Sequence, residues 1–174
     1  MGKSYGNYDM TDRIIDDDEL NEIIRKFSPL VCWKVGFSIG SMIHFDMGDR
    51  LEEKSLDGSM RHVGSASLWL NGDTWVIREG GENIISSEEV YREFVEKKLS
   101  KMFSNQELEK CIIDNNSGTM TIYFSDYINI IAYPDMEEEF PLDEGLVDFV
   151  FPDGRTVYWN NENSLYISDT LSNV

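Results

Sequence analysis

Short apolar runs with a period of two residues, separated by glycine and asparagine, fill most of this chain and favour a fold built mainly from β-strands. Alternate side chains of a strand face opposite sides of a sheet, so this period marks one buried and one exposed face. Glycine and asparagine tolerate the positive φ angles of tight turns. We therefore expect strands at residues 31–37, 41–46, 65–70, 74–78, 109–113, 119–124, 127–133, 146–151, 156–159 and 164–167.

Two windows instead have the period of an amphipathic helix. The first follows Asp16, which is a favourable N-cap, and ends at Ser28-Pro29 because proline restricts the residue before it. The second follows Ser86 and Glu89, which have the spacing of a capping box. The apolar side chains are Leu20, Ile23, Ile24 and Phe27 in the first window, and Tyr91, Phe94, Val95, Leu99 and Met102 in the second.

The order of these elements predicts an α+β fold that is mostly antiparallel β, with two β-meander blocks, an N-terminal helix and a central helix. Asn71-Gly72 predicts a tight hairpin between the strands on either side of it, and residues 152–155 predict a second hairpin. We expect residues 1–15 to be a mobile tail. Residues 16–174 are expected to form one globular domain with sub-blocks 16–86 and 87–174.

The composition is that of a globular protein, with 41% hydrophobic and 12% aromatic residues in 174. No apolar run reaches the roughly 18 residues of a membrane span, and the N-terminal residues lack the pattern of a signal peptide. Cys32 and Cys111 fit buried thiols better than a disulfide framework. These features predict a cytoplasmic protein that does not bind membranes.

The charge is unevenly distributed along the chain. Of the net charge of −18, residues 103–174 carry −12, because 14 acids there face only Lys110 and Arg155. Such a field repels nucleic acid and attracts basic proteins. We expect Asp126, Asp148 and Asp153 to reinforce one field. The acids are densest around two apolar residues, and the predicted partner-binding residues are Asp135, Met136, Glu137, Glu138, Glu139, Phe140, Asp143 and Glu144.

The sequence contains few residues at the spacing that a catalytic or metal site requires. Its two histidines and two cysteines are scattered, without the paired spacing of metal ligands, so we expect no metal and no cofactor. Nucleophilic catalysis would require Cys32 to pair with His44 or His62, and nothing local supports that pairing. We therefore expect no catalytic residues. A small hydrolase that uses two carboxylates is an alternative, because acids are abundant.

Several short motifs occur in a recognisable order. They are Trp33-Lys34-Val35, Ser38-Ile39-Gly40-Ser41, the stretch from Phe45 to Gly48, Leu68-Trp69-Leu70, Trp75-Val76-Ile77 and Pro152-Asp153-Gly154-Arg155. In this order the chain resembles a loosely defined family of small, uncharacterised bacterial proteins found among immunity-like and accessory genes. It departs from that pattern at Ser38, where the family has glycine, and at residues 52–60, which lengthen a loop. The resemblance implies a binding role and transfers no catalytic residue.

Charge and resemblance together predict a protein that binds and inhibits another protein. The leading hypothesis is an immunity protein that neutralises a basic bacterial toxin, such as a nuclease domain, through its acidic surface. The alternative is a phage or mobile-element antidefence protein whose acids imitate the charge of nucleic acid. Both hypotheses require a negative surface that faces a positive groove.

Overall fold

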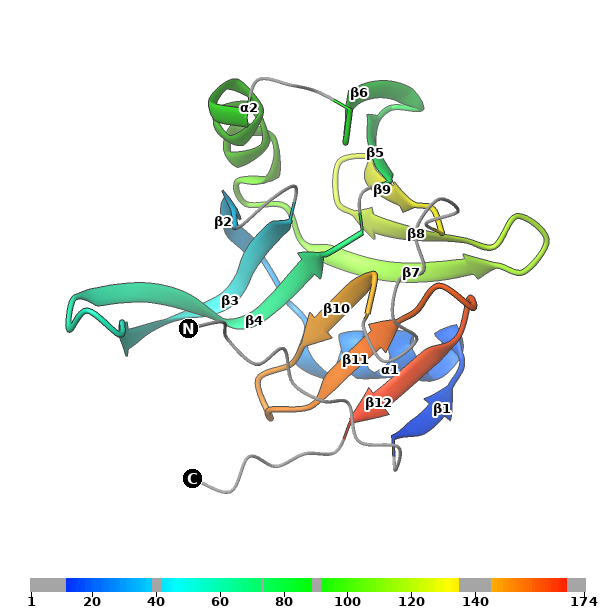
Figure 1. Cartoon of the computed structure of the whole chain (residues 1–174), viewed down its shortest axis with the longest axis horizontal. Coiled ribbons are helices and arrows are strands. Elements are labelled where there is room, and N and C mark those ends of the chain that lie inside the picture. Colours follow the sequence, from blue (N-terminus) through cyan, green and yellow to red (C-terminus); the bar gives the residue numbers. More distant parts are fainter. Residues whose placement is uncertain (1–11, 39–41, 73, 89–91, 135–144, 169–174) are drawn as a thin grey trace.

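The computed structural model describes residues 12–38, 42–72, 74–88, 92–134 and 145–168, which form two helices and twelve strands in two antiparallel sheets (Figure 1). The predicted α+β, mostly antiparallel β fold is confirmed. The elements are β1 (Arg13–Ile15), α1 (Asp17–Phe27), β2 (Cys32–Phe37), β3 (Ile43–Lys54), β4 (Met60–Leu70), β5 (Trp75–Glu79), β6 (Glu82–Ser86), α2 (Arg92–Phe103), β7 (Leu108–Asp114), β8 (Thr119–Phe124), β9 (Ile128–Ala132), β10 (Val147–Val150), β11 (Thr156–Trp159) and β12 (Leu165–Ser168).

The larger sheet combines strands from both ends of the chain, whereas the smaller sheet is built from the strands between them. The seven-stranded sheet has the order β1-β12-β11-β10-β4-β3-β2, and the five-stranded sheet has the order β6-β5-β9-β8-β7. In the larger sheet, Leu70 of β4 lies opposite Val147 of β10. In the smaller sheet, Trp75 of β5 lies opposite Ala132 of β9. The sub-blocks 16–86 and 87–174 therefore contribute strands to both sheets.

The connection at Asn71-Gly72 crosses from one sheet to the other, so the predicted hairpin between its flanking strands is wrong. β4 pairs with β3 and β10, whereas β5 pairs with β6 and β9. A Cβ atom on Gly72 would lie 3.0 Å from Leu146 Cδ2, so the connection packs closely against the residue that precedes β10. Pairing with distant strands outweighs the local turn preference here.

The hairpin predicted at residues 152–155 is confirmed, because β10 and β11 are antiparallel neighbours. Phe151 N–H donates to the carbonyl of Arg155, and Gly154 N–H donates to the carbonyl of Phe151. Gly154 has a φ of +85°, which glycine adopts without steric penalty.

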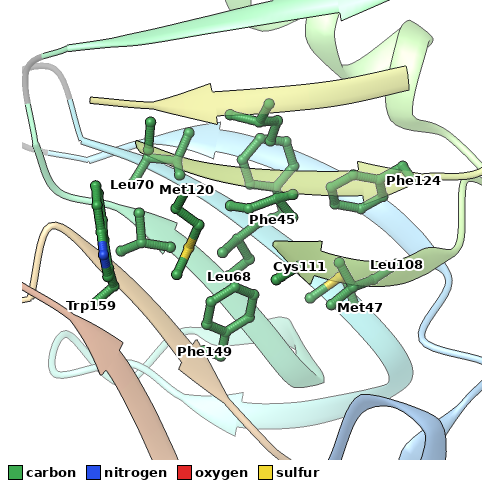
Figure 2. Packing of buried hydrophobic residues seen from close by; sticks show 14 of the residues in the cluster. Phe45, Met47, Leu68, Leu70, Leu108, Cys111, Met120, Phe124, Phe149 and Trp159 are labelled. Carbon is green, nitrogen blue, oxygen red and sulfur yellow. The ribbon is translucent and has the colours of Figure 1, made fainter. Parts of the chain in front are cut away.

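The core lies between the two sheets and follows the expected period of two. Figure 2 shows Phe45, Leu68 and Phe149 of the larger sheet facing Met120 and Phe124 of the smaller one. The rings of Phe45 and Phe124 both pack against Phe103 at the end of α2, with centroids 4.9 Å apart in each pair. Such clusters combine burial of apolar area with favourable edge-to-face geometry.

Helix α1 begins and ends as predicted. Asp16 caps it by accepting a hydrogen bond from Glu19 N–H at 2.9 Å. The helix also covers the outer edge of β7, because the Asn21 side chain bonds both the N–H and the carbonyl of Cys111, at 2.8 and 2.7 Å. Asp17 accepts a further bond from Ile113 N–H. Side chains thus satisfy an edge that would otherwise be open to pairing.

The region of the second helix differs from the prediction. Ser86, the proposed cap, lies opposite Val76 in strand β6, and the described part of the helix begins at Arg92. Phe94, assigned to the apolar face, is 65% exposed, whereas Phe103 is fully buried. Pairing of residues 82–86 with β5 competes with the local capping signal. Neither described helix is long and apolar enough to cross a membrane.

Two further differences concern segments that were expected to be irregular. Residues Arg13–Ile15, within the expected tail, form β1 beside β12; residues 1–11 lie outside the described residues. Strands β3 and β4 continue well beyond the predicted strands 41–46 and 65–70 as a two-stranded ribbon that extends to the left in Figure 1. Its outer part is exposed, including Leu56 at 97%.

Candidate functional site

The eight predicted partner-binding residues lie in residues 135–144, outside the described residues. We call residues 135–144 the acidic segment. It follows β9 and precedes β10, so it connects the smaller sheet to the larger one. The structure describes the residues on both sides of it, which establish where the segment leaves and rejoins the two sheets.

The described residues on both sides of the acidic segment are bonded to the connection between β4 and β5. Before the segment, Tyr133 N–H donates to the carbonyl of Thr74 at 3.0 Å. After it, the carbonyl of Leu146 accepts from the N–H groups of Asn71 and Gly72, at 2.8 and 3.2 Å. Leu146 N–H in turn donates to the carbonyl of Trp159 at 2.7 Å. The described residues at the two ends of one crossing therefore lie beside the described residues of the other.

Side chains reinforce the point at which the chain enters β10. The Asn71 amide donates to the carbonyl of Gly145 at 3.1 Å and to Asp148 Oδ2 at 2.9 Å. A Cβ atom on Gly145 would lie only 1.9 Å from Asp148 Oδ1, so a larger residue could not occupy this position without displacing the carboxylate. Asn71, Gly145 and Asp148 therefore form one polar junction at the end of the acidic segment.

Another turn at this end of the smaller sheet adds negative charge. Asp114 accepts hydrogen bonds from the N–H groups of Asn116 and Ser117 and from the Ser117 hydroxyl, and these bonds lower the pKa of its carboxyl. The turn lies close to Pro134, the residue before the acidic segment, because a Cβ atom on Gly118 would lie 3.7 Å from Pro134 Cγ.

Of the three acids expected to reinforce the field, one lies beside the acidic segment. That acid is Asp148, through its bond to Asn71. Asp153 instead pairs with Arg155 at 2.8 Å and approaches Lys26 at 3.9 Å. Asp126 lies at the opposite end of β9. The sheet topology therefore places Asp126 and Asp153 away from Gly145, which borders the acidic segment, and their contribution to one field stays a prediction.

The cysteine and histidine residues do not form a nucleophile–base pair. Cys32 is fully buried in the core, and burial raises the pKa of its thiol to about 12. His44 lies on the outer face of the same sheet, where it stacks on Trp69 at 4.8 Å. His62 lies on the exposed ribbon opposite Glu52. Among the described residues, no three His, Cys, Asp or Glu side chains are grouped so as to hold a metal ion.

One polar cluster was not anticipated from the sequence. Asp46 is 6% exposed and accepts a hydrogen bond from Gly64 N–H at 3.0 Å. Its Oδ2 lies 3.8 Å from His44 Nε2 and 3.9 Å from Lys34 Nζ, beyond hydrogen-bonding distance. Burial lowers the pKa of His44. We interpret the cluster as structural, since Asp46 is fixed by the backbone of β4.

A second feature that sequence reasoning missed is an exposed aromatic residue at a hairpin tip. Tyr127 is 85% exposed in the three-residue connection between β8 and β9. The sequence contains a signal for this turn, because Ser125-Asp126 separates two predicted strands, but the second predicted strand includes Tyr127. The exposed tyrosine lies at the end of β9 opposite the acidic segment.

Comparisons with known proteins identify no relative of this chain. No protein-family model, no curated protein and no solved structure matches the chain.

Proposed function

We propose that this chain is a protein inhibitor that binds a basic protein through its acidic segment, and that it serves as an immunity protein against a basic bacterial toxin such as a nuclease. The observation that carries the proposal is that a ten-residue sequence with six acids and no base is bordered on both sides by residues held on the scaffold. Tyr133 and Leu146, on either side of it, bond to one connection between the sheets. Connections between the elements of a rigid scaffold are common carriers of binding function.

The chemistry of the acidic segment supports a protein partner. Its carboxylates would accelerate encounter with a cationic surface through long-range attraction. Met136 and Phe140 supply apolar groups that can fill cavities on the partner and slow dissociation. A nuclease has to expose a cationic surface to bind its substrate, so a protein that covers this surface inhibits the enzyme by blocking access.

The cysteines support a cytoplasmic site of action. Cys32 and Cys111 are both free thiols and both buried. Free buried thiols are usual in a reducing compartment, whereas small secreted proteins tend to use their cysteines in disulfides.

The proposal is tested by affinity capture from a lysate of the organism that encodes the chain, at low salt. The wild type is compared with the acidic-segment variant Glu137→Gln, Glu138→Gln, Glu139→Gln. A control of equal charge change is Glu52→Gln, Glu93→Gln, Glu96→Gln, because these three acids are exposed elsewhere. We expect the wild type and the control to retain one basic toxin or nuclease that elutes with salt and is inhibited by the chain.

The acidic-segment variant should retain much less of this protein. Equal retention by all three proteins would contradict the proposal. Capture of a restriction or guide-directed defence complex in place of a toxin would instead support an antidefence role.

Kinetics on the captured partner separate the two parts of the mechanism. Replacing Glu137, Glu138 and Glu139 with lysine should slow association strongly at low salt and less at high salt, because the screening length falls to about 3 Å at 1 M. Phe140→Ala should raise the dissociation rate more than it lowers the association rate. The reverse pattern for Phe140→Ala would exclude an anchoring role for this side chain.

A further inference from the structure

The turn between β8 and β9 has an unusual residue at a restricted backbone position. Asp126 and Tyr127 have φ angles of 57° and 62°, and Ile128 N–H donates to the carbonyl of Ser125 at 3.3 Å. Two central residues with positive φ are the signature of a type I′ turn. Aspartate adopts such angles with little difficulty, but the second position strongly favours glycine, and a bulky side chain there is an outlier.

Neighbouring segments hold this turn in place. Gln106 donates from Nε2 to Asp126 Oδ2 at 3.0 Å and accepts from the Ser125 hydroxyl at 2.6 Å. Gly80 N–H donates to the carbonyl of Tyr127 at 3.1 Å. The ring itself is 85% exposed, so it gains little packing within the chain in return for its disfavoured backbone. Glycine would suit this position better for folding alone.

The surroundings of Tyr127 are acidic and open. The adjoining turn between β5 and β6 brings Glu79 opposite Glu82, and both side chains are exposed. Gly80 and Gly81 form its tip, where an added Cβ atom would meet nothing within 4 Å. The one base in these two hairpins is Arg78, which donates to Asn83 at 2.7 Å.

We propose that Tyr127 with Asp126, Glu79 and Glu82 forms a second docking surface, which we call the tyrosine tip, and that its occupant is an arginine- or lysine-bearing segment of a basic protein. The inference rests on the proposed function for the identity of that protein. A guanidinium or ammonium group can lie over the tyrosine ring while the carboxylates accept its hydrogen bonds. Tyrosine surrounded by polar groups is also a common energetic centre of interfaces.

The tyrosine tip and the acidic segment lie at opposite ends of β9. Five residues of strand separate them, which corresponds to about 17 Å. This separation is within the span of an ordinary protein interface, so one partner can contact both surfaces along the smaller sheet.

The test uses hexa-arginine amide as the probe and follows backbone amide signals of the isotope-labelled chain by NMR. We expect the amides of Gly80, Gly81, Asp126 and Tyr127 to shift on titration, with saturation that gives a local affinity. In Tyr127→Gly this affinity should fall about two- to fivefold, the value of an exposed cation–π contact. The unfolding midpoint of Tyr127→Gly should stay equal or rise by up to about 4 °C, because glycine relieves the backbone.

The matched control is Phe94→Ala, which removes an exposed ring that lies 6.0 Å from Lys98 Nζ and therefore should not attract a cation. Its affinity for the probe at the tip should equal that of the wild type. Unshifted tip amides, an unchanged affinity in Tyr127→Gly, or a midpoint lowered by several degrees would each overturn the inference. The acidic-segment variant distinguishes the docking surface from the proposed function. The amides of the tyrosine tip should still shift in this variant when hexa-arginine amide is added, whether or not the acidic segment binds the toxin.

Discussion

The polar junction at the end of the acidic segment makes a quantitative prediction for Asn71→Ala. The substitution removes one bond to the Gly145 carbonyl at 3.1 Å and one to the Asp148 carboxylate at 2.9 Å. A neutral hydrogen bond contributes about 0.5–1.5 kcal/mol and one to a charged group about 1.5–3 kcal/mol. Since the junction is only partly buried, we expect the free energy of unfolding to fall by about 2–3 kcal/mol.

The assay is urea and thermal unfolding of wild type and variant at neutral pH. For a chain of this length, the expected loss corresponds to a midpoint lower by about 4–12 °C. The control is Asn83→Ala, which removes an exposed amide that accepts from Arg78 at 2.7 Å and should change stability by less than about 0.5 kcal/mol. Equal stability of the two variants would refute the assignment of Asn71 as the residue that fixes this junction.

A second substitution at the same position adds a pH signature. Asn71→Asp places a carboxylate beside that of Asp148, and mutual repulsion should raise the pKa of the pair above its value in the unfolded chain. A raised carboxyl pKa in the folded state means that stability is lost as the pH rises through it and is regained on acidification. Asn71→Asp should therefore be less stable than Asn71→Ala at pH 7 and should approach it as the pH falls.

Three further predictions concern the core, the thiols and one turn. Phe103→Ala should lower the free energy of unfolding by about 3–5 kcal/mol in urea, because the ring is fully buried; a loss below 1 kcal/mol would contradict its position between the two sheets. Cys32 and Cys111 should resist alkylation by iodoacetamide at pH 8 until the chain unfolds, because burial raises the pKa of both thiols. Mass spectrometry measures the labelling, and rapid labelling of the native protein would show that the thiols are accessible. The pKa of Asp114 is lowered in the folded state, so its stabilising effect should be present above the unfolded value of about 3.9 and lost as the pH falls below it. The free energy of unfolding of Asp114→Asn should therefore differ from that of the wild type at pH 6 and converge with it in acid. A difference that does not change with pH would exclude this carboxylate as the cause.

Local sequence patterns predict the elements of this fold where the local signal and the tertiary pairing agree. Helix α1 has its cap at Asp16, and Leu20, Ile23 and Ile24 of its expected apolar face are buried. The turn at Gly154 has the positive φ that its sequence favours. In β8, buried side chains alternate with partly exposed ones, as the apolar period requires. Each of these features is decided by residues close together in the chain.

The sequence was misleading where distant strands compete with a local signal. Asn71-Gly72 is a favourable hairpin sequence, yet the strands on either side of it pair with β10 and β9 and lie in different sheets. Ser86 has the spacing of a helix cap but pairs with Val76 instead. No local pattern carries information about such partners, because pairing depends on which apolar faces can be buried together.

The candidate site was predictable in composition and unpredictable in arrangement. The density of acids in residues 135–144 is a property of the sequence, and its assignment to a partner stays a prediction. That Tyr133 and Leu146 bond to the same connection depends on the sheet order. The exposure of Tyr127 depends on backbone angles that a tyrosine rarely adopts, so its residue type pointed to a strand interior.

Under the proposed function, charge in the acidic segment guides the approach of a basic partner. The most direct measurement is the association rate constant of the captured partner between 20 mM and 1 M salt, for wild type, the acidic-segment variant and the control of equal charge change. The claim predicts a rate at least about tenfold lower for the acidic-segment variant at low salt, with all three rates converging at high salt. Identical rates and salt dependence for the acidic-segment variant and the control would contradict it.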